Sequence, residues 1–202
     1  MKISKIFYIG GIILVIGGIA AIAWFFFGNF RSELTMKSET NEFMEELEDL
    51  DPLPIQEAVE EASKNILEGN TIAVLEFPAF DQKIAVKEGT TNYILSISAG
   101  HMMETEQVWD SAGTSAIAAH NNTYFKNLKK FKVSDKILVY TRAGVYQYEV
   151  YRTDTILPTD LSVIEDVPGQ KTLTLITCDL SGDYRVIVMA RGGVRISGPQ
   201  DI

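Results

Sequence analysis

The sequence is poor in the residues that usually carry metal sites and disulfide bonds. Its 202 residues include one cysteine, Cys178, and two histidines, His101 and His120. A single cysteine excludes an intramolecular disulfide, and these three residues show no metal-ligand spacing, so no metal site is predicted. Cys178 is therefore either an inert buried thiol or a reactive one.

The chain also lacks an excess of basic residues. Its formal net charge of −9 argues against a nucleic-acid partner, which needs basic side chains for its phosphates. No glycine-rich phosphate loop follows a strand and opens a helix, so nucleotide binding is unsupported. The acid excess is local: residues 29–70 hold 12 acidic and 3 basic side chains, whereas residues 71–202 hold 15 and 13. With 46 % hydrophobic residues, the chain is not a disordered one.

A run of 23 residues without a charge, residues 6–28, is the longest apolar segment. At about 1.5 Å per residue, a helix of this length crosses a hydrocarbon core of roughly 30 Å. The alternative is a signal peptide cleaved after Ala21-Ile22-Ala23. The apolar run continues through Trp24-Phe25-Phe26-Phe27, however, which favours an uncleaved transmembrane anchor.

The charges that flank this segment predict its orientation. Lys2 and Lys5 precede it, and acidic residues follow soon after it. The positive-inside rule then places residues 1–28 as a cytoplasmic tip and single-pass anchor in the cell membrane, with residues 29–202 outside.

Residues 29–70 predict an acidic helical stalk. Apolar residues recur at helical spacing in residues 30–50 and again in residues 55–67. Pro52 and Pro54 separate the two segments, because proline disfavours helical geometry in the residue before it. We interpret the acidic faces as the solvated surface of a linker between the membrane and the next domain.

Residues 71–202 predict a mostly β domain. Many short β-rich runs at close spacing, without long helices, are typical of an antiparallel barrel or sandwich. Strands are expected at 71–77, 82–86, 115–119, 136–141, 145–155, 172–178 and 185–190, with a further one near 93–98 and short helices at 123–130 and 159–163.

Three side chains that could act in catalysis lie at the ends of these expected strands. A six-residue connection separates Cys178 from Arg185, so a hairpin brings both to the same edge of the sheet, and His120 follows another apolar run. A thiolate nucleophile, an imidazole that moves protons and a guanidinium that stabilises an oxyanion suit acyl transfer through a thioester. The structural alternative is a packing cysteine and a surface arginine.

Several segments resemble one known family. Thr174-Leu175-Ile176-Thr177-Cys178 resembles the TLxTC signature of sortases, the membrane-anchored cysteine transpeptidases of Gram-positive bacteria. The resemblance covers residues 71–192 and includes Ile72–Phe80, Ser98–Met102 and Ala116–His120. It implies a closed antiparallel β-barrel of about eight strands, with Cys178, His120 and Arg185 as catalytic residues.

This sequence departs from the family pattern on both sides of the catalytic histidine. Ala119 stands where glycine is usual, and Asn121 stands where arginine commonly follows. The resemblance assigns catalysis to His120 rather than His101. Arg185, Arg191 and Arg195 all lie downstream of Cys178. Strand geometry selects Arg185, which begins the strand next to the Cys178 end, whereas Arg191 lies roughly 20 Å away at the far end at about 3.3 Å per residue.

The resemblance further implies the reaction and its partners. Cys178 attacks the threonine carbonyl of an LPxTG-type sorting signal on an exported protein, and an amine of a peptidoglycan precursor resolves the thioacyl enzyme. Thr177 and Ala119 adjoin the reaction centre, and the apolar part of the signal packs near Ile156, Val163 and Ile164. Some members bind calcium through acidic side chains near this groove. Glu104 and Glu106 are the nearest candidates here, and no cofactor is predicted.

The single N-terminal anchor fits the plan of a class A (housekeeping) sortase. Two alternatives to this interpretation remain. A pilin-polymerising sortase takes a lysine as acceptor and carries a lid with Asp-Pro-aromatic, of which Asp51-Pro52-Leu53 is a partial match. A catalytically silent membrane-tethered module captures peptides without cleaving them.

Overall fold

The computed structural model describes residues 2–64 and 66–199, without the side chains of residues 2–7, 9 and 25–33. The chain divides into two units, Met1–Thr35 and Met36–Ile202, which we describe separately. The first unit holds most of helix α1 (Lys2–Glu48), which includes the predicted anchor. No helix is long and apolar enough to cross a membrane when the search is confined to the described residues. Within the predicted anchor, the side chains of residues 6, 7, 9 and 25–28 lie outside what the structure describes.

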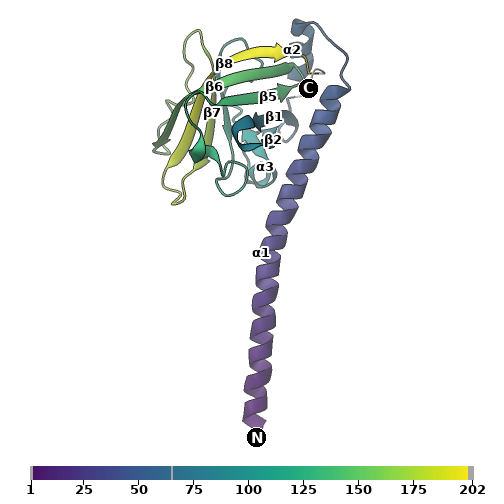
Figure 1. Ribbon diagram of the computed structural model, residues 1–202, viewed down its shortest axis with the longest axis vertical. Helices are drawn as coiled ribbons and strands as arrows, with labels where there is room; N and C mark the ends of the chain where they lie inside the picture. Colours follow the sequence, from purple (N-terminus) through teal and green to yellow (C-terminus); the bar gives the residue numbers. More distant parts are fainter. Residues whose placement is uncertain (1, 65, 200–202) are drawn as a thin grey trace. The chain divides into compact units, whose positions relative to one another are not determined.

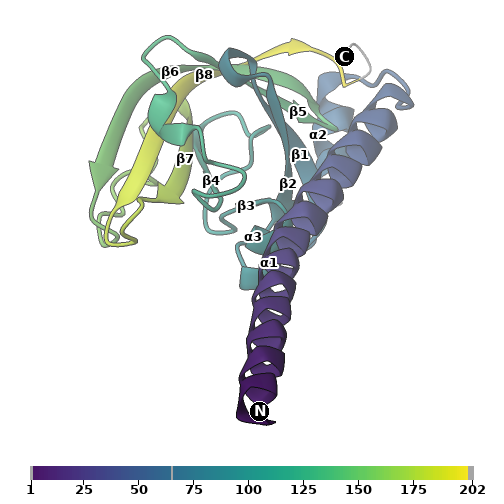
Figure 2. The ribbon, with the colours of Figure 1, turned by 60° about the horizontal axis from the view of Figure 1, so that its bottom comes forward.

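The second unit contains a closed barrel of eight strands. Its strand order is β1-β2-β3-β4-β7-β8-β6-β5, and the strands curve around a common interior (Figures 1 and 2). The strands are β1 (Thr71–Phe77), β2 (Gln82–Glu88), β3 (Ala99–His101), β4 (Gly113–Ala118), β5 (Lys136–Thr141), β6 (Gly144–Ile156), β7 (Lys171–Cys178) and β8 (Arg185–Ser197). The helical elements are α2 (Ile55–Lys64), α3 (Asn92–Ile97) and the short 3-10 helices η1 (Pro78–Phe80) and η2 (Leu128–Lys130).

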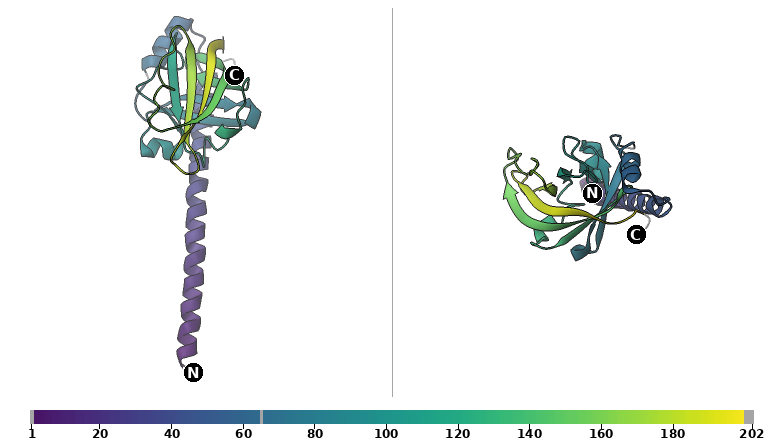
Figure 3. Two further views of the ribbon diagram at one scale, coloured as in Figure 1. Left: turned by 90° about the vertical axis from the view of Figure 1, so that its left-hand side faces the viewer. Right: turned by 90° about the horizontal axis from the view of Figure 1, so that it is seen from above.

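The barrel is mixed rather than antiparallel, which corrects the sequence prediction. Strand β3 runs parallel to β2, and β7 runs parallel to β4. Parallel strands need a crossover connection, which α3 supplies for the first pair and the β5–β6 hairpin with its flanking loops for the second. Figure 3 shows β6, β8 and β7 side by side, as their antiparallel pairing requires.

Two local predictions were wrong, and a third is confirmed only in part. Near residues 93–98, where a strand was expected, residues 92–97 form α3, because the Thr91 hydroxyl caps the helix by accepting a hydrogen bond from the Ile94 amide. Residues 159–163 form turns rather than a helix. There the Asp160 carboxylate accepts hydrogen bonds from the Ser162 amide and hydroxyl, which compete with helical bonding. Of the helix expected at 123–130, only η2 forms.

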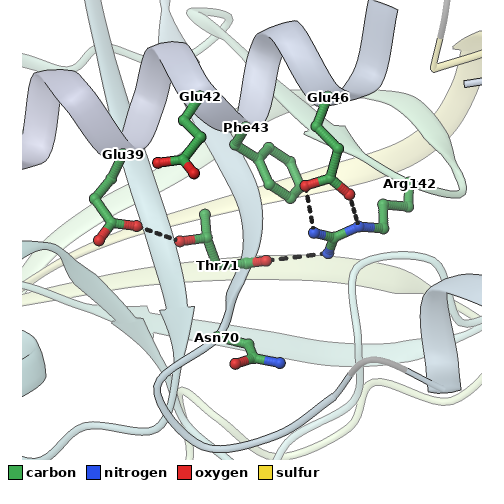
Figure 4. Close-up of a pocket in the computed structure, with 7 residues that line it drawn as sticks. All are labelled: Glu39, Glu42, Phe43, Glu46, Asn70, Thr71 and Arg142. Atoms are coloured by element: carbon green, nitrogen blue, oxygen red, sulfur yellow. Dashed lines mark hydrogen bonds and ion pairs between the residues drawn. The ribbon is translucent and has the colours of Figure 1, made fainter. Parts of the chain in front are cut away.

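The end of α1 packs on the barrel, which corrects the predicted solvated stalk for this segment. Phe43 and Leu47 are buried and form an apolar cluster with Val74 of β1. Arg142, from the turn between β5 and β6, donates hydrogen bonds of 2.6 and 2.8 Å to the Glu46 carboxylate (Figure 4). The compact unit therefore begins at Met36, whereas the sequence prediction began the barrel domain at residue 71.

This packing predicts that Leu47→Ala lowers the free energy of unfolding by about 2–5 kcal/mol, because the fully buried side chain leaves a cavity. The matched control is Leu53→Ala, whose exposed side chain should cost no more than about 0.5 kcal/mol. Urea denaturation of the full chain, followed by circular dichroism, measures both. Equal stability of the two variants would mean that α1 does not dock on the barrel.

Candidate active site

Strand pairing places Cys178 and Arg185 opposite each other. Cys178 ends β7, Arg185 begins β8, and the two residues are register partners in the antiparallel ladder. Residues directly opposite across such a ladder have Cβ atoms about 4.5–5.5 Å apart. The hairpin predicted from the sequence is thus confirmed, and both half-buried side chains lie at one edge of the barrel.

The connection between these residues is organised by Asp179. Its carboxylate accepts hydrogen bonds from the amides of Gly182 (2.8 Å) and Tyr184 (3.2 Å). The Ser181 hydroxyl donates a third bond of 2.8 Å, and this bond is the main reason that the pKa of Asp179 lies below its ordinary value. The loop from Cys178 to Arg185 is therefore a defined turn.

The parallel pairing of β4 with β7 brings His120 to the same edge. Ala118 is the register partner of Ile176, and the Ala119 amide donates a 3.1 Å hydrogen bond to the Ile176 carbonyl. His120 lies two residues after Ala118, and Cys178 lies two residues after Ile176. His120 is exposed, so its imidazole is accessible to a substrate.

The second histidine is held in the barrel interior. His101 is fully buried, and its Nδ1 lies 3.1 Å from a carboxylate oxygen of Glu88. Its Nε2 lies 3.1 Å from the Glu106 carbonyl oxygen. Both ring nitrogens are thus engaged, and a group enclosed in this way cannot touch a substrate.

Removing the partner of His101 should destabilise the protein. Burial raises the pKa of Glu88, but the hydrogen bond from His101, the charge of that imidazole and the Gln107 amide outweigh it, so the pKa falls below its ordinary 4.5. A carboxyl with a lowered folded-state pKa stabilises the fold above its unfolded-state pKa, and this contribution disappears as the pH falls through the folded-state value.

We therefore expect Glu88→Gln to lower the free energy of unfolding by about 3 kcal/mol at pH 7, with a smaller difference from the parent below about pH 4. Urea denaturation at both pH values measures this. The turnover number of the folded variant should stay within about twofold of the parent, because Glu88 and His101 are both buried and do not line the cleft. Unchanged stability at pH 7 would contradict the structural assignment.

A cleft of about 290 Å³ lies beside Arg185. Three predicted substrate residues, Ile156, Val163 and Ile164, line it, and Ile156 is also the register partner of Arg185 in β6. The Thr174 hydroxyl donates a 2.7 Å hydrogen bond to the Val163 carbonyl and so ties this wall to β7.

The other two predicted substrate residues lie outside this lining. The Thr177 hydroxyl donates a buried 2.6 Å hydrogen bond to the Ala119 carbonyl, so these residues connect β7 to the chain before His120. Thr90, Leu95 and Met102 also line the cleft, and sequence reasoning missed them. Because residues 93–98 were expected to form a strand, the sequence analysis could not place Leu95 of α3 beside the cleft.

The remaining downstream arginines lie away from this edge. Arg191 pairs with Thr172 at the other end of the β7–β8 ladder, and its guanidinium lies 5.6 Å from the centre of the Tyr151 ring. The Arg195 Nε donates a hydrogen bond to the Ala143 carbonyl. Arg185 is therefore the arginine at the Cys178 edge.

The acidic residues considered for calcium form no cage. Among the side chains that the structure describes, no group of three or more His, Cys, Asp or Glu is arranged to hold a metal ion. Glu106 lies beside Asp110, and the hydrogen bond between these carboxyl groups, with a further contribution from Asp166, raises the pKa of Glu106.

Comparisons with known proteins agree with this architecture. The sequence model of the sortase domain matches residues 75–192. Sortase A of Streptococcus agalactiae is 29 % identical over 128 residues, which cover 59 % of this chain and 51 % of that protein, so the chain spans about half the length of this relative.

Solved structures show the same fold. The structure of a Clostridium perfringens sortase D5 transpeptidase superposes with a TM-score of 0.69 and 28 % identity, covering 78 % of this chain and 97 % of that one. A Clostridium perfringens sortase C, with the C-terminal cell wall sorting motif, superposes with a TM-score of 0.68 and 18 % identity, covering 76 % and 97 %. The chain belongs to the sortase family, whose members are cysteine transpeptidases.

Proposed function

We propose that this chain cleaves an LPxTG-type sorting signal between threonine and glycine and transfers the exported protein to an amine of the cell wall. The observation that supports it most directly is the strand register, in which Cys178 faces Arg185 and its strand pairs in parallel with the strand that ends two residues before His120. A thiol, an imidazole and a guanidinium at one accessible edge supply the nucleophile, the proton carrier and the oxyanion donor of acyl transfer.

In the first half-reaction, the Cys178 thiolate attacks the threonine carbonyl carbon and forms a tetrahedral oxyanion. Arg185 donates hydrogen bonds to this oxyanion. The intermediate collapses to a thioester as the carbon–nitrogen bond to glycine breaks, and the His120 imidazolium gives its proton to the leaving amine.

In the second half-reaction, an incoming amine attacks the thioester carbon. His120, now neutral, accepts the proton that the amine loses. An amide bond forms, the Cys178 thiolate leaves, and His120 again carries the proton. The cycle conserves protons and needs no cofactor.

The cleft beside Arg185 suits the apolar part of such a signal. Exposed leucines, Leu157 and Leu161, join Ile156, Val163 and Ile164 in its lining, so an extended peptide with apolar side chains can bury them there. The Clostridium perfringens sortase C structure with a sorting motif supports this class of ligand.

We also propose that residues 6–28 anchor the protein in the cell membrane with the catalytic barrel outside. The support is the charge-free run of 23 residues with Lys2 and Lys5 before it. This location places the catalytic residues where exported proteins and peptidoglycan precursors meet.

The test incubates the full chain in detergent with an LPxTG peptide and, in separate reactions, triglycine or a lysine-containing pilin peptide. Mass spectrometry should find the peptide cut after threonine and joined to the added amine. Products with triglycine support a wall acceptor, and products with the lysine peptide alone support a pilin-polymerising enzyme. Binding without cleavage would leave the protein a silent peptide-binding module.

A further inference from the structure

Three hydrogen bonds join the segment that contains His120 to the segment that contains Cys178. The Ala119 amide donates to the Ile176 carbonyl (3.1 Å), and the Thr177 hydroxyl donates to the Ala119 carbonyl (2.6 Å). The third bond follows His120: the Asn121 side-chain amide donates to the Asp179 carbonyl oxygen at 2.6 Å.

These bonds flank both candidate catalytic residues. The Thr177–Ala119 bond connects the residues that precede Cys178 and His120, and the Asn121–Asp179 bond connects the residues that follow them. We propose that Asn121, through Asp179, is a positioning residue that holds His120 in register with Cys178. The inference rests on the proposed function, because it gives those two residues their catalytic roles.

Asp179 also connects Asn121 to Arg185. Its carboxylate organises the turn to Tyr184, and the Arg185 guanidinium donates to the Gly182 carbonyl (3.1 Å) within that turn. A side chain that holds the Asp179 main chain therefore acts on the start of the loop that connects Cys178 to Arg185. A displacement of about 1 Å in such a site costs up to about 10²-fold in rate.

The chemistry of position 121 is specific. A backbone carbonyl only accepts hydrogen bonds, so residue 121 must donate, and the asparagine amide does so. Aspartate has nearly the same size but turns an acceptor toward that carbonyl. Asn121→Asp thus removes the bond with little change in volume, and Asn121→Ala removes it by truncation.

The experiment compares these variants with Asn127→Ala in the full chain. Asn127 is half-buried like Asn121 and donates its amide to the Gln82 side chain at 3.1 Å, so its loss also breaks a bond between distant segments. Steady-state kcat and KM are measured with an LPxTG peptide and triglycine. The rate of Cys178 alkylation by iodoacetamide at pH 7 is measured without substrate.

We expect both Asn121 variants to lower kcat about 10- to 100-fold with KM within about twofold of the parent. Alkylation should slow by about fivefold, because the thiolate is the reactive form and a nearby imidazolium stabilises it. Asn127→Ala should change neither quantity by more than about twofold. Thermal unfolding of all variants checks that the fold is retained.

Three results would overturn the inference: Asn121 variants with parental kcat, a lowered kcat with parental alkylation, or equal losses in Asn127→Ala. Failure of the proposed function is a separate result, in which the parent cleaves no LPxTG peptide. The alkylation rates then still decide whether Asn121 controls the environment of Cys178.

Discussion

Replacing Cys178 with alanine should abolish transpeptidation while leaving the barrel folded. The thiol is the only nucleophile of its kind in the chain, and removing a covalent nucleophile costs about 10⁴-fold or more in rate. The side chain is half-buried at a strand end rather than packed in the interior, so its truncation leaves no large cavity.

The measurement is product formation from an LPxTG peptide and triglycine, with circular dichroism and thermal unfolding as tests of folding. Cys178→Ser is the conservative companion, since its hydroxyl keeps the volume but is a much weaker nucleophile at neutral pH. Activity above about 1 % of the parent in the alanine variant would remove Cys178 from the mechanism. Gross unfolding would give it a structural role instead.

Arg185→Lys should lower kcat/KM by about 10²-fold although the positive charge is kept. A guanidinium is a planar fork of donors that can hold an oxyanion and a neighbouring substrate oxygen together, and an ammonium group lacks this geometry. Arg185 is suited to that role because it faces Cys178 and lines the adjacent cleft.

Arg191→Lys is the matched control in the same strand. Arg191 pairs with Thr172 at the far end of the ladder, with its guanidinium 5.6 Å from the centre of the Tyr151 ring, so its replacement should change kcat/KM by no more than about twofold. Steady-state kinetics on an LPxTG peptide compares the two variants. Equal losses, or a larger loss for Arg191→Lys, would show that another arginine serves the oxyanion.

Strands and hairpins that depend on neighbouring residues could be predicted from the sequence. The apolar run that ends in Cys178 and the short polar connection to Arg185 predict their pairing, because a hairpin constrains residues only a few positions apart. The same local information failed at residues 92–97, where the Thr91 cap favours a helix over a strand.

Contacts between distant segments needed the tertiary structure. The amphipathic pattern of residues 30–50 indicates that one face is apolar, but it does not show that Phe43 and Leu47 pack on β1. Nor does any local pattern show that Leu95 and Met102 line the same cleft as Val163.

The sequence by itself determined which residues can perform the chemistry, since it holds one thiol and two imidazoles, and it determined that Cys178 and Arg185 share a hairpin. Only the tertiary structure decided that the strand before His120 pairs in parallel with the strand that ends in Cys178, and that Asn121 bonds to Asp179. Residues 58 positions apart meet there because β4 and β7 pair in parallel. That pairing requires a crossover through β5 and β6, and its free energy comes from closing the whole barrel rather than from any local preference.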